Sequence, residues 1–534
     1  MNRFRRALIL LHRYLGIPLS VMFVVWFISG IVMIYAGGMP AVSSDEQLAR
    51  RAPLELGAMQ MSAADVIERA GIVAVPTAVR AQTVLGRPAW RIEFGFGRAM
   101  TLFADTAEIL ESVSEEAALT VAADYLSAEP SQISFVRTVT EPDQWTLTHR
   151  GSLPLHQFSV ADGRGTYIYV SATDGEVPLV TTRANRFFSW IGVIPHWLYF
   201  TPLRLDQPLW FWTVVVLSAL GCVLAVAGLI LGVTQFHRSR PFSLNKSVRY
   251  RGWMRWHYYS GVLFGVFALT WVFSGLMSME PFAWTNAQGL DVPRSALTGG
   301  ELQMEDYPAP SQLAALPGIG DGPGIAELSF VRMLGEPYLA VTPSPLDGND
   351  DAVRERLHQP YPLALDGRLG RLLLHAQTLE PLDTPFAQAH LTEAIRLAVP
   401  DVPIAATTLL DDYDSYYYSR DRSAPLPVVR IEFDDPMRTW YYVDPADARF
   451  VARTHRFSRI ERWLFNGLHS LDFAFWYDKR PLWDFGMIAL SLGALLSSAI
   501  GLYLGFRRLL PKSLTAKRLT SRDDDDRRRT TLTG

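Results

Sequence analysis

The chain has 534 residues, of which 49% are hydrophobic and 19% are charged, so it exceeds one ordinary domain and is more apolar than a soluble protein requires. Its net charge of -3 shows no bias toward a nucleic-acid partner. The single cysteine, Cys222, lies inside an apolar stretch, which excludes a disulfide within the chain and a cysteine-ligated metal. Part of the chain is therefore expected to lie in lipid.

Four segments are long and apolar enough to cross a hydrocarbon core of about 30 Å, which needs about 20 helical residues. They are residues 8–36, 209–235, 257–280 and 484–506. A cleaved signal peptide is the alternative for the first segment. The length of that apolar run, and its reappearance as the third segment, favour a membrane helix.

Basic residues mark which ends of these helices face the cytoplasm, because cytoplasmic flanks carry an excess of Lys and Arg. They stand before the first segment, between the second and third, and after the fourth: Arg3, Arg5, Arg6, Arg238, Arg240, Lys246, Arg249, Arg251, Arg255, Arg507, Arg508 and Lys512. Residues 1–7, the basic loop 236–256 and a disordered tail at 507–534 are therefore expected in the cytoplasm. Regions 37–208 and 281–483 would face the periplasm of a bacterial inner membrane.

The chain repeats itself, which indicates two similar halves. Near the starts of the first and third segments, His12, Gly16, Trp26, Ser29 and Gly30 match His257, Gly261, Trp271, Ser274 and Gly275. Further along, a gapless run pairs Leu153, Tyr169, Trp190, His196, Trp210, Gly228 and Gly232 with Leu426, Tyr442, Trp463, His469, Trp483, Gly501 and Gly505. Both halves begin in the cytoplasm, so a pseudo-two-fold axis along the membrane normal is expected.

The two extracytoplasmic regions combine helix and strand patterns. Ser62–Ala70 and Glu115–Tyr125 have helical periodicity. Half-buried strands are predicted where apolar and polar residues alternate, at Trp90–Phe94, Gln157–Val160, Thr166–Val170, Val428–Phe433 and Thr439–Val443. Each half thus predicts a helix followed by a small antiparallel sheet, and residues 293–324, rich in Pro and Gly, predict a linker or a long loop. The fold class is an α+β membrane protein.

These motifs resemble a known family. Leu153-Pro154, Asp162-Gly163, Tyr169-Val170 and Asp174-Gly175, repeated at Leu426-Pro427, Phe433-Asp434, Tyr442-Val443 and Asp444-Pro445, are similar to PepSY domains. With four helices and the starts His12-Arg13-Tyr14-Leu15-Gly16 and His257-Tyr258-Tyr259-Ser260-Gly261, the whole chain resembles the PepSY-associated transmembrane family of iron-regulated membrane proteins. Characterised relatives include ferric-siderophore reductases that carry b-type haem, so the resemblance implies that activity and cofactor.

Four of the eleven histidines lie at matched positions on the membrane borders: His12, His257, His196 and His469. Ionisable residues at such positions suggest function, and with the resemblance they are interpreted as axial ligands of haem iron. The expected arrangement is two b-type haems, one held by His12 and His257 near the cytoplasmic face and one by His196 and His469 near the other. For any one of these residues, an interfacial anchor is the alternative.

Other residues leave alternatives open. Six aromatic residues are candidates to line porphyrin pockets or to form an interfacial belt: Trp26, Trp197, Tyr199, Trp256, Trp271 and Phe473. Arg13, Arg251 and Arg255 are candidates to pair with haem propionates or to mark the cytoplasmic side, and Arg186 and Arg459 to contact haem or a ferric chelate or to cap a helix. The roles of His149, His156 and His237 stay open, whereas His358, His375, His390 and His455 are interpreted as surface residues.

The chain contains no dinucleotide-binding or Walker motif, so the electron donor is expected to be a membrane quinol or a separate cytoplasmic reductase. The predicted function is a haem-containing reductase that passes electrons across the membrane to a periplasmic ferric siderophore or other Fe(III) complex. The alternative is a non-catalytic scaffold whose PepSY-like domains bind or restrain a protease or peptide. A transporter is less favoured, because the four helices are continuous and apolar at their centres.

Overall fold

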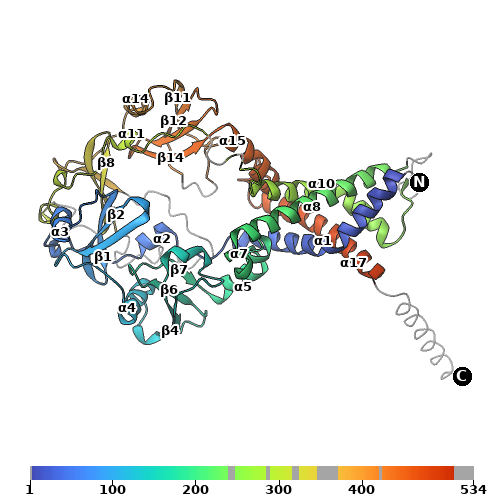
Figure 1. Cartoon of the computed structure of the whole chain (residues 1–534), viewed down its shortest axis with the longest axis horizontal. Helices are drawn as coiled ribbons and strands as arrows, with labels where there is room; N and C mark the ends of the chain where they lie inside the picture. The colour runs from blue at the N-terminus through green and yellow to red at the C-terminus, as the bar shows by residue number, and fades with distance from the viewer. Residues whose placement is uncertain are drawn as a thin grey trace. The chain divides into compact units, whose positions relative to one another are not determined.

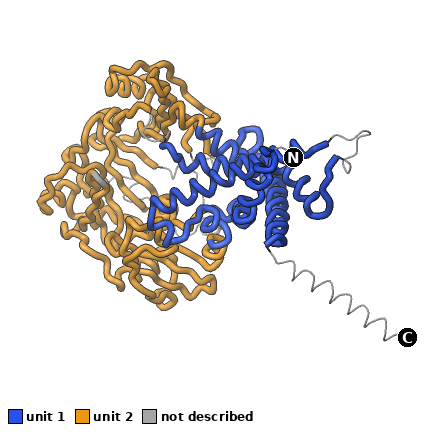
Figure 2. Tube along the Cα trace, turned by 45° about the vertical axis from the view of Figure 1, so that its right-hand side comes forward, with its two compact units in different colours: residues 1–37, 190–283, 461–534 blue, residues 38–189, 284–460 orange. Residues whose placement is uncertain are grey.

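A computed structural model describes residues 3–237, 247–283, 285, 289–315, 324–344, 371–419 and 424–509. The chain divides into two compact units (Figure 2): unit 1 is 1–37, 190–283 and 461–534, and unit 2 is 38–189 and 284–460. Among the described residues, unit 1 holds four long apolar helices and unit 2 holds three antiparallel sheets (Figure 1). This confirms the predicted α+β membrane architecture. The disordered tail was predicted to begin at residue 507, but residues 507–509 form the last turn of a helix, and the rest of that tail lies outside the described residues.

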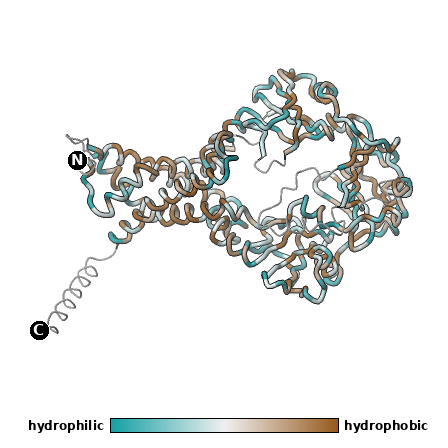
Figure 3. The backbone as a smooth tube through the Cα atoms, turned by 180° about the vertical axis from the view of Figure 1, so that it is seen from behind, coloured by the Kyte–Doolittle hydropathy of each residue, from teal (hydrophilic) through white to brown (hydrophobic). Residues whose placement is uncertain are grey.

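The four long helices of unit 1 have the length and composition of membrane spans. They are α1 Arg3–Ala36, α8 Gln207–Thr234, α10 Trp253–Ser278 and α17 Leu482–Leu509, each beginning a few residues before its predicted range. The shortest, α10, has 26 residues. At a rise of about 1.5 Å per residue it is longer than a hydrocarbon core of about 30 Å. Figure 3 shows hydrophobic residues along all four helices.

Short helices precede α8 and α17 in the chain. They are α5 Arg183–Ile191, α6 Val193–His196 and α7 Thr201–Leu205 in the first half, and α15 Arg456–Arg462, the π-helix Trp463–Gly467 and α16 Leu468–Ser470 in the second. Two tryptophan side chains tie these stretches to the long helices: Trp210 Nε1 donates to Trp197 O at 2.9 Å, and Trp483 Nε1 donates to Ser470 O at 3.0 Å. Most of both stretches belongs to unit 1, together with the long helices.

Two of the sheets in unit 2 are the repeated module that the sequence predicts. The first consists of β4 Ile133–Val139, β5 Leu155–Val160, β6 Tyr167–Ser171 and β7 Leu179–Thr181 and follows α4 Glu115–Leu126. The second consists of β11 Ile404–Leu410, β12 Val428–Phe433, β13 Trp440–Asp444 and β14 Arg449–Thr454 and follows α14 Gln388–Ala398. Both have consecutive strand order, so each module is built from local pairings.

The third sheet has six strands and joins the two halves. Its order is β10 Leu372–His375, β9 Glu336–Pro343, β8 Ile325–Met333, β1 Ala78–Val84, β2 Arg87–Phe94 and β3 Arg98–Phe103. Each half contributes three strands, and the halves meet where β1 pairs antiparallel with β8, with Arg80 opposite Ser329. Regions 37–208 and 281–483 thus share one sheet, an arrangement that the sequence did not indicate.

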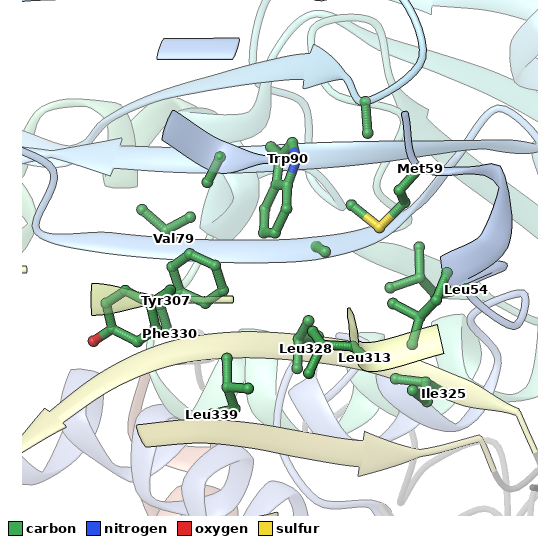
Figure 4. Packing of buried hydrophobic residues seen from close by; sticks show 14 of the residues in the cluster. Leu54, Met59, Val79, Trp90, Tyr307, Leu313, Ile325, Leu328, Phe330 and Leu339 are labelled. Atoms are coloured by element: carbon green, nitrogen blue, oxygen red, sulfur yellow. The ribbon is translucent and has the colours of Figure 1, made fainter. Parts of the chain in front are cut away.

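The core beside this sheet corrects the first of the two alternatives for 293–324, a linker, because the described part of this stretch is packed (Figure 4). This stretch contains α11 Ser295–Thr298, a 3-10 turn and α12 Pro310–Ala314, and Leu313 is only 1% exposed. Tyr307 stacks on Phe330 of β8 at 4.1 Å, next to the buried Trp90. Apolar side chains at irregular spacing therefore pack a core here, although Pro and Gly obscure their pattern. Residues 316–323 lie outside the described part of the chain.

The remaining short elements of unit 2 are α2 Ser44–Ala49, α3 Ala63–Arg69 and the 3-10 helices Leu56–Ala58, Gly95–Gly97, Pro130–Gln132, Leu147–Ser152 and Met304–Asp306. The helix α3 begins with a capping box, in which Ser62 and Asp65 each bond the other's backbone N–H.

Replacing Leu313 with alanine tests whether the Pro- and Gly-rich stretch packs as described. A buried leucine truncated to alanine leaves a cavity and costs about 2–5 kcal/mol of unfolding free energy. Scanning calorimetry of the purified protein should therefore show a lower transition temperature for unit 2. Val73→Ala is the control, because Val73 is 95% exposed. Equal transition temperatures for the two variants would restore the linker interpretation.

Candidate functional site: two pairs of histidines

The structure places the four matched histidines in two pairs, each formed across the two halves of the chain. His12 of α1 lies beside His257 of α10, with ring centroids 6.2 Å apart. His196, at the end of α6, lies beside His469 of α16, with ring centroids 6.1 Å apart. Equivalent residues thus face each other, as a pseudo-two-fold axis requires.

Main-chain carbonyls hold the first pair. His12 Nδ1 lies 3.1 Å from Leu224 O of α8, and His257 Nδ1 lies 3.0 Å from Ser497 O of α17. Leu224 and Ser497 are themselves equivalent in the two halves. A carbonyl oxygen can only accept a hydrogen bond, so each Nδ1 carries the proton and donates it. Each Nε2 then has a free lone pair, the form in which imidazole binds a metal.

Serine hydroxyls hold the second pair in the same tautomer. Ser29 Oγ donates to Trp26 O at 3.1 Å and lies 3.0 Å from His196 Nδ1. Ser274 Oγ donates to Trp271 O at 2.9 Å and lies 2.9 Å from His469 Nδ1. Because each hydroxyl proton is already used, the serine oxygen accepts from Nδ1, which again leaves Nε2 with its lone pair.

The second pair is neutral at physiological pH. Burial, reinforced by the neighbouring His469 ring, lowers the pKa of His196 to about 4. Burial likewise lowers the pKa of His469 to about 4. Because the charged form is disfavoured, both rings stay unprotonated above about pH 5 and can act as ligands.

A cavity of about 460 Å³ adjoins the first pair, within the usual range of about 300–1,000 Å³ for small-molecule and cofactor sites. Besides His12 and His257, it is lined by three pairs of equivalent glycines: Gly16 and Gly261, Gly228 and Gly501, Gly232 and Gly505. A Cβ on Gly228 would lie 2.8 Å from His12 Cε1, and one on Gly501 would lie 3.2 Å from His257 Cε1. The glycines therefore make the room that the two rings occupy.

These residues fit a haem iron with two axial imidazoles. Two imidazoles on opposite sides of one metal, with metal–nitrogen bonds of about 2 Å, have their centroids about 6 Å apart. Both observed separations match that spacing. A hydrogen bond from the second ring nitrogen is the usual outer support of a metal-bound histidine. In the described part of the chain, no group of three or more His, Cys, Asp or Glu side chains could hold a metal ion by itself.

The aromatic candidates separate into core and surface residues. Trp271 is 9% exposed and packs with Trp26 in the core of the helix bundle, one turn from the serines that hold the second pair. Trp197 and Trp256 are 42% and 60% exposed, as belt residues are. Trp26 and Trp271 therefore adjoin the second pair. The two exposed tryptophans are positioned to meet lipid.

Two arginines line the cavity, Arg13 of α1 and Arg508 of α17. Arg508 was counted in the sequence only as a marker of the cytoplasmic side. Arg255 donates from Nε to Tyr250 O at 2.7 Å, and Arg251 is exposed, so neither lines this cavity. Arg13 and Arg508 are thus the cations placed to meet carboxylates bound there.

Arg186 and Arg459 have matching structural partners. Arg186 donates to Gly165 O at 2.9 Å and lies over the Tyr167 ring at 4.5 Å. Arg459 donates to Arg438 O at 2.8 Å and lies over the equivalent Trp440 ring at 3.9 Å. Each arginine lies in the helix that follows one of the four-stranded sheets. Its contacts join that helix to that sheet.

Three further described histidines have ordinary partners. Both ring nitrogens of His156 are bonded, to Thr138 Oγ1 at 3.0 Å and to Val113 O at 2.9 Å. His455 is buried, 6% exposed, with Nε2 3.2 Å from Thr285 O, which corrects its interpretation as a surface residue. The His375 ring accepts two backbone N–H bonds in a turn. His358 lies outside the described residues.

Several partners in the two sites were not assigned a role from the sequence. Ser29, Ser274, Gly228 and Gly501 were matched between the halves, and a hydroxyl or a glycine kept at equal places in an apolar helix was the available signal. The carbonyls of Leu224 and Ser497 carry no side-chain signal, since any residue supplies one.

Comparison with known proteins agrees with this architecture. No curated protein matches the chain. The family model described as the PepSY-associated TM region matches residues 9–320, more than half of the 534 residues. That range includes three of the four long helices and three of the four paired histidines. The chain is therefore a membrane protein that belongs to the PepSY-associated transmembrane family.

Proposed function

We propose that the chain is a haem-containing membrane reductase that passes electrons across the membrane to an Fe(III) complex, such as a ferric siderophore. The observation that carries the proposal is the geometry of the two histidine pairs. All four rings direct Nδ1–H to a protein acceptor, leave Nε2 free, and stand about 6 Å apart within each pair. Haem held by two imidazoles would supply one-electron transfer at each site.

The residues of the chain have separate tasks in this proposal. The histidines bind, and the carbonyls and serines orient them. The glycines provide room for a large planar group, while Arg13 and Arg508 attract its carboxylates. Apolar side chains of the four helices exclude water between the two pairs, which keeps charged reactants at the faces of the membrane.

The substrate would be reduced outside the helix bundle, on the face where His196 and His469 lie. Each electron converts one Fe(III) to Fe(II) and is drawn from a donor at the opposite face, either a membrane quinol or a separate cytoplasmic reductase. Siderophores with hard oxygen ligands hold Fe(II) less tightly than Fe(III), so reduction would release the iron for uptake. The proposed location is the bacterial inner membrane, with both chain termini in the cytoplasm.

Transmembrane electron transfer tests this function directly. Protein in phospholipid vesicles, with ferric citrate and an Fe(II)-specific chromogenic chelator trapped inside, should form Fe(II) when dithionite is added outside. Vesicles that carry His257→Ala should form it no faster than protein-free vesicles. If wild type and protein-free vesicles formed Fe(II) at the same rate, the reductase proposal would be wrong.

Removing the hydroxyl of Ser274 should weaken haem binding at the second pair and leave binding at the first pair unchanged. Ser274→Ala deprives His469 Nδ1 of its acceptor, and loss of such outer support weakens metal binding by about 10–100-fold. Transfer of haem to excess apomyoglobin should be correspondingly faster for half of the bound haem. Ser278→Ala on the same helix is the control, since the Ser278 hydroxyl donates to Gly275 O at 2.8 Å and contacts neither histidine pair. Equal transfer rates for the two variants would argue against the role of Ser274.

A further inference from the structure

Arg204 lies at the membrane boundary of unit 1, in the short helix α7 just before α8 begins. Its guanidinium carbon is 4.4 Å from the centroid of the Trp210 ring and 5.1 Å from that of Tyr199. The Trp210 ring is held in place by its hydrogen bond to Trp197 O. The positive charge is therefore fixed against aromatic faces, which attract it.

This guanidinium has no anionic partner in the described part of the chain. Its Nε and Nη1 are buried without a hydrogen-bond acceptor, whereas Nη2 is not among the buried atoms and has no acceptor in the described part of the chain. The nearest acidic residue along the chain, Asp206, accepts from Leu209 N at 3.0 Å and so caps α8. An arginine is always charged and carries five N–H donors. A buried donor that makes no hydrogen bond costs free energy. An anion from outside the chain can bond Nη2, and it would also offset the positive charge of the whole guanidinium.

The second half contains an arginine that also lies over a tryptophan but has an anionic partner within the chain. Trp483 is the equivalent of Trp210 and makes the equivalent bond to Ser470 O. The arginine over it, Arg480, forms an ion pair with Asp484 at 2.7 Å. The residue equivalent to Asp484 in the first half is Phe211. Arg480 is the equivalent of Gln207 and not of Arg204, so the second half pairs a different arginine with a carboxylate four residues later, and Pro208 stands at that spacing from Arg204.

The surroundings of Arg204 indicate the chemistry of the missing anion. Several residues close to Arg204 along the chain are large, apolar and exposed: Trp197 42%, Phe200 38%, Leu205 50%, Leu209 54% and Trp212 56%. Such a surface at the end of a membrane helix meets the boundary between headgroups and acyl chains. A free anion would gain nothing from these apolar neighbours, whereas a phospholipid offers a phosphate beside hydrocarbon.

We propose that Arg204, supported by Trp210 and Tyr199, binds the phosphate group of a phospholipid at the end of the bundle that carries His196 and His469. The planar guanidinium matches phosphate geometry, and an arginine stem can lie along apolar surface while its charged end meets the lipid headgroups. The site is independent of haem binding, and it would attach one lipid to the first half of the bundle only.

Lipid retention tests the site in the whole protein. Native mass spectrometry of protein extracted in mild detergent should show one more tightly bound phospholipid per chain for wild type than for Arg204→Gln. The control is Arg480→Gln, which breaks the internal ion pair of the second half and should keep the lipid. Size-exclusion chromatography of each variant checks that it is folded.

Thermal stability in defined additives distinguishes a lipid from a simple anion. Short-chain phosphatidylglycerol should raise the melting temperature of wild type and of Arg480→Gln, but not that of Arg204→Gln. Inorganic phosphate at the same concentration should have no such effect. The proposal is overturned if Arg204→Gln retains as much lipid as wild type, or if inorganic phosphate stabilises wild type as well as the lipid does.

Discussion

Protein with His257 replaced by alanine is expected to purify with about half of the wild-type haem, because each histidine pair would hold one haem. His469→Ala should lose the other half, and in both variants the remaining haem should keep the low-spin spectrum of two imidazole ligands. The measurement is haem per chain with optical spectra. His156→Ala is the control, since both nitrogens of that ring are already bonded within unit 2.

A ligand role can be separated from a folding role at the same position. His257→Met offers a thioether in place of the imidazole, and a methionine axial ligand raises the reduction potential of haem. This variant should recover haem that His257→Ala lacks, with a higher midpoint potential at one site only. If His257→Ala kept all of its haem in the low-spin form, the assignment of the first pair would be wrong.

Adding a single methyl group to Gly228 is expected to empty the first site. The new Cβ would lie 2.8 Å from His12 Cε1, a distance that forces the ring to move. In Gly501→Ala the corresponding distance to His257 Cε1 is 3.2 Å, so the loss of haem should be smaller. Haem per chain, measured by the pyridine haemochrome spectrum, should follow that order.

The matched control is Gly275→Ala, where no atom lies within 4 Å of the added Cβ. Alanine favours a helix over glycine by about 1 kcal/mol, so this change should leave haem content unaltered and raise the melting temperature slightly. Equal haem content in Gly228→Ala and Gly275→Ala would show that the space around His12 is not needed for a bound group.

The parts of the fold that could be predicted depend on local signals. The four helices follow from apolar length, and the repeated helix-plus-sheet modules follow from alternation in segments such as Val428–Phe433, which forms β12 as predicted. The six-stranded sheet could not be predicted, because the pairing of β1 with β8 joins residues far apart in the chain. No local pattern specifies such a partner.

The candidate site, like the fold, could be predicted only in part from the sequence. The repeat identified the four histidines. Equal depth in the membrane suggested how they pair, since His12 and His257 lie near the starts of equivalent helices. The depth of His196 and His469 could not be read from the sequence, because a dozen residues separate each from its long helix. Contacts with Ser29 and Ser274, on the neighbouring helices, set that depth.

The proposed function requires bound haem, which can be measured in the unmodified protein. The visible absorption spectrum of the detergent-purified chain, oxidised and then reduced with dithionite, should show low-spin b-type bands from about two haems per chain. Protein that is well folded, expressed in cells replete with haem, and nevertheless colourless would contradict the account. The PepSY-like modules would then be better explained as a scaffold that binds a protease or peptide.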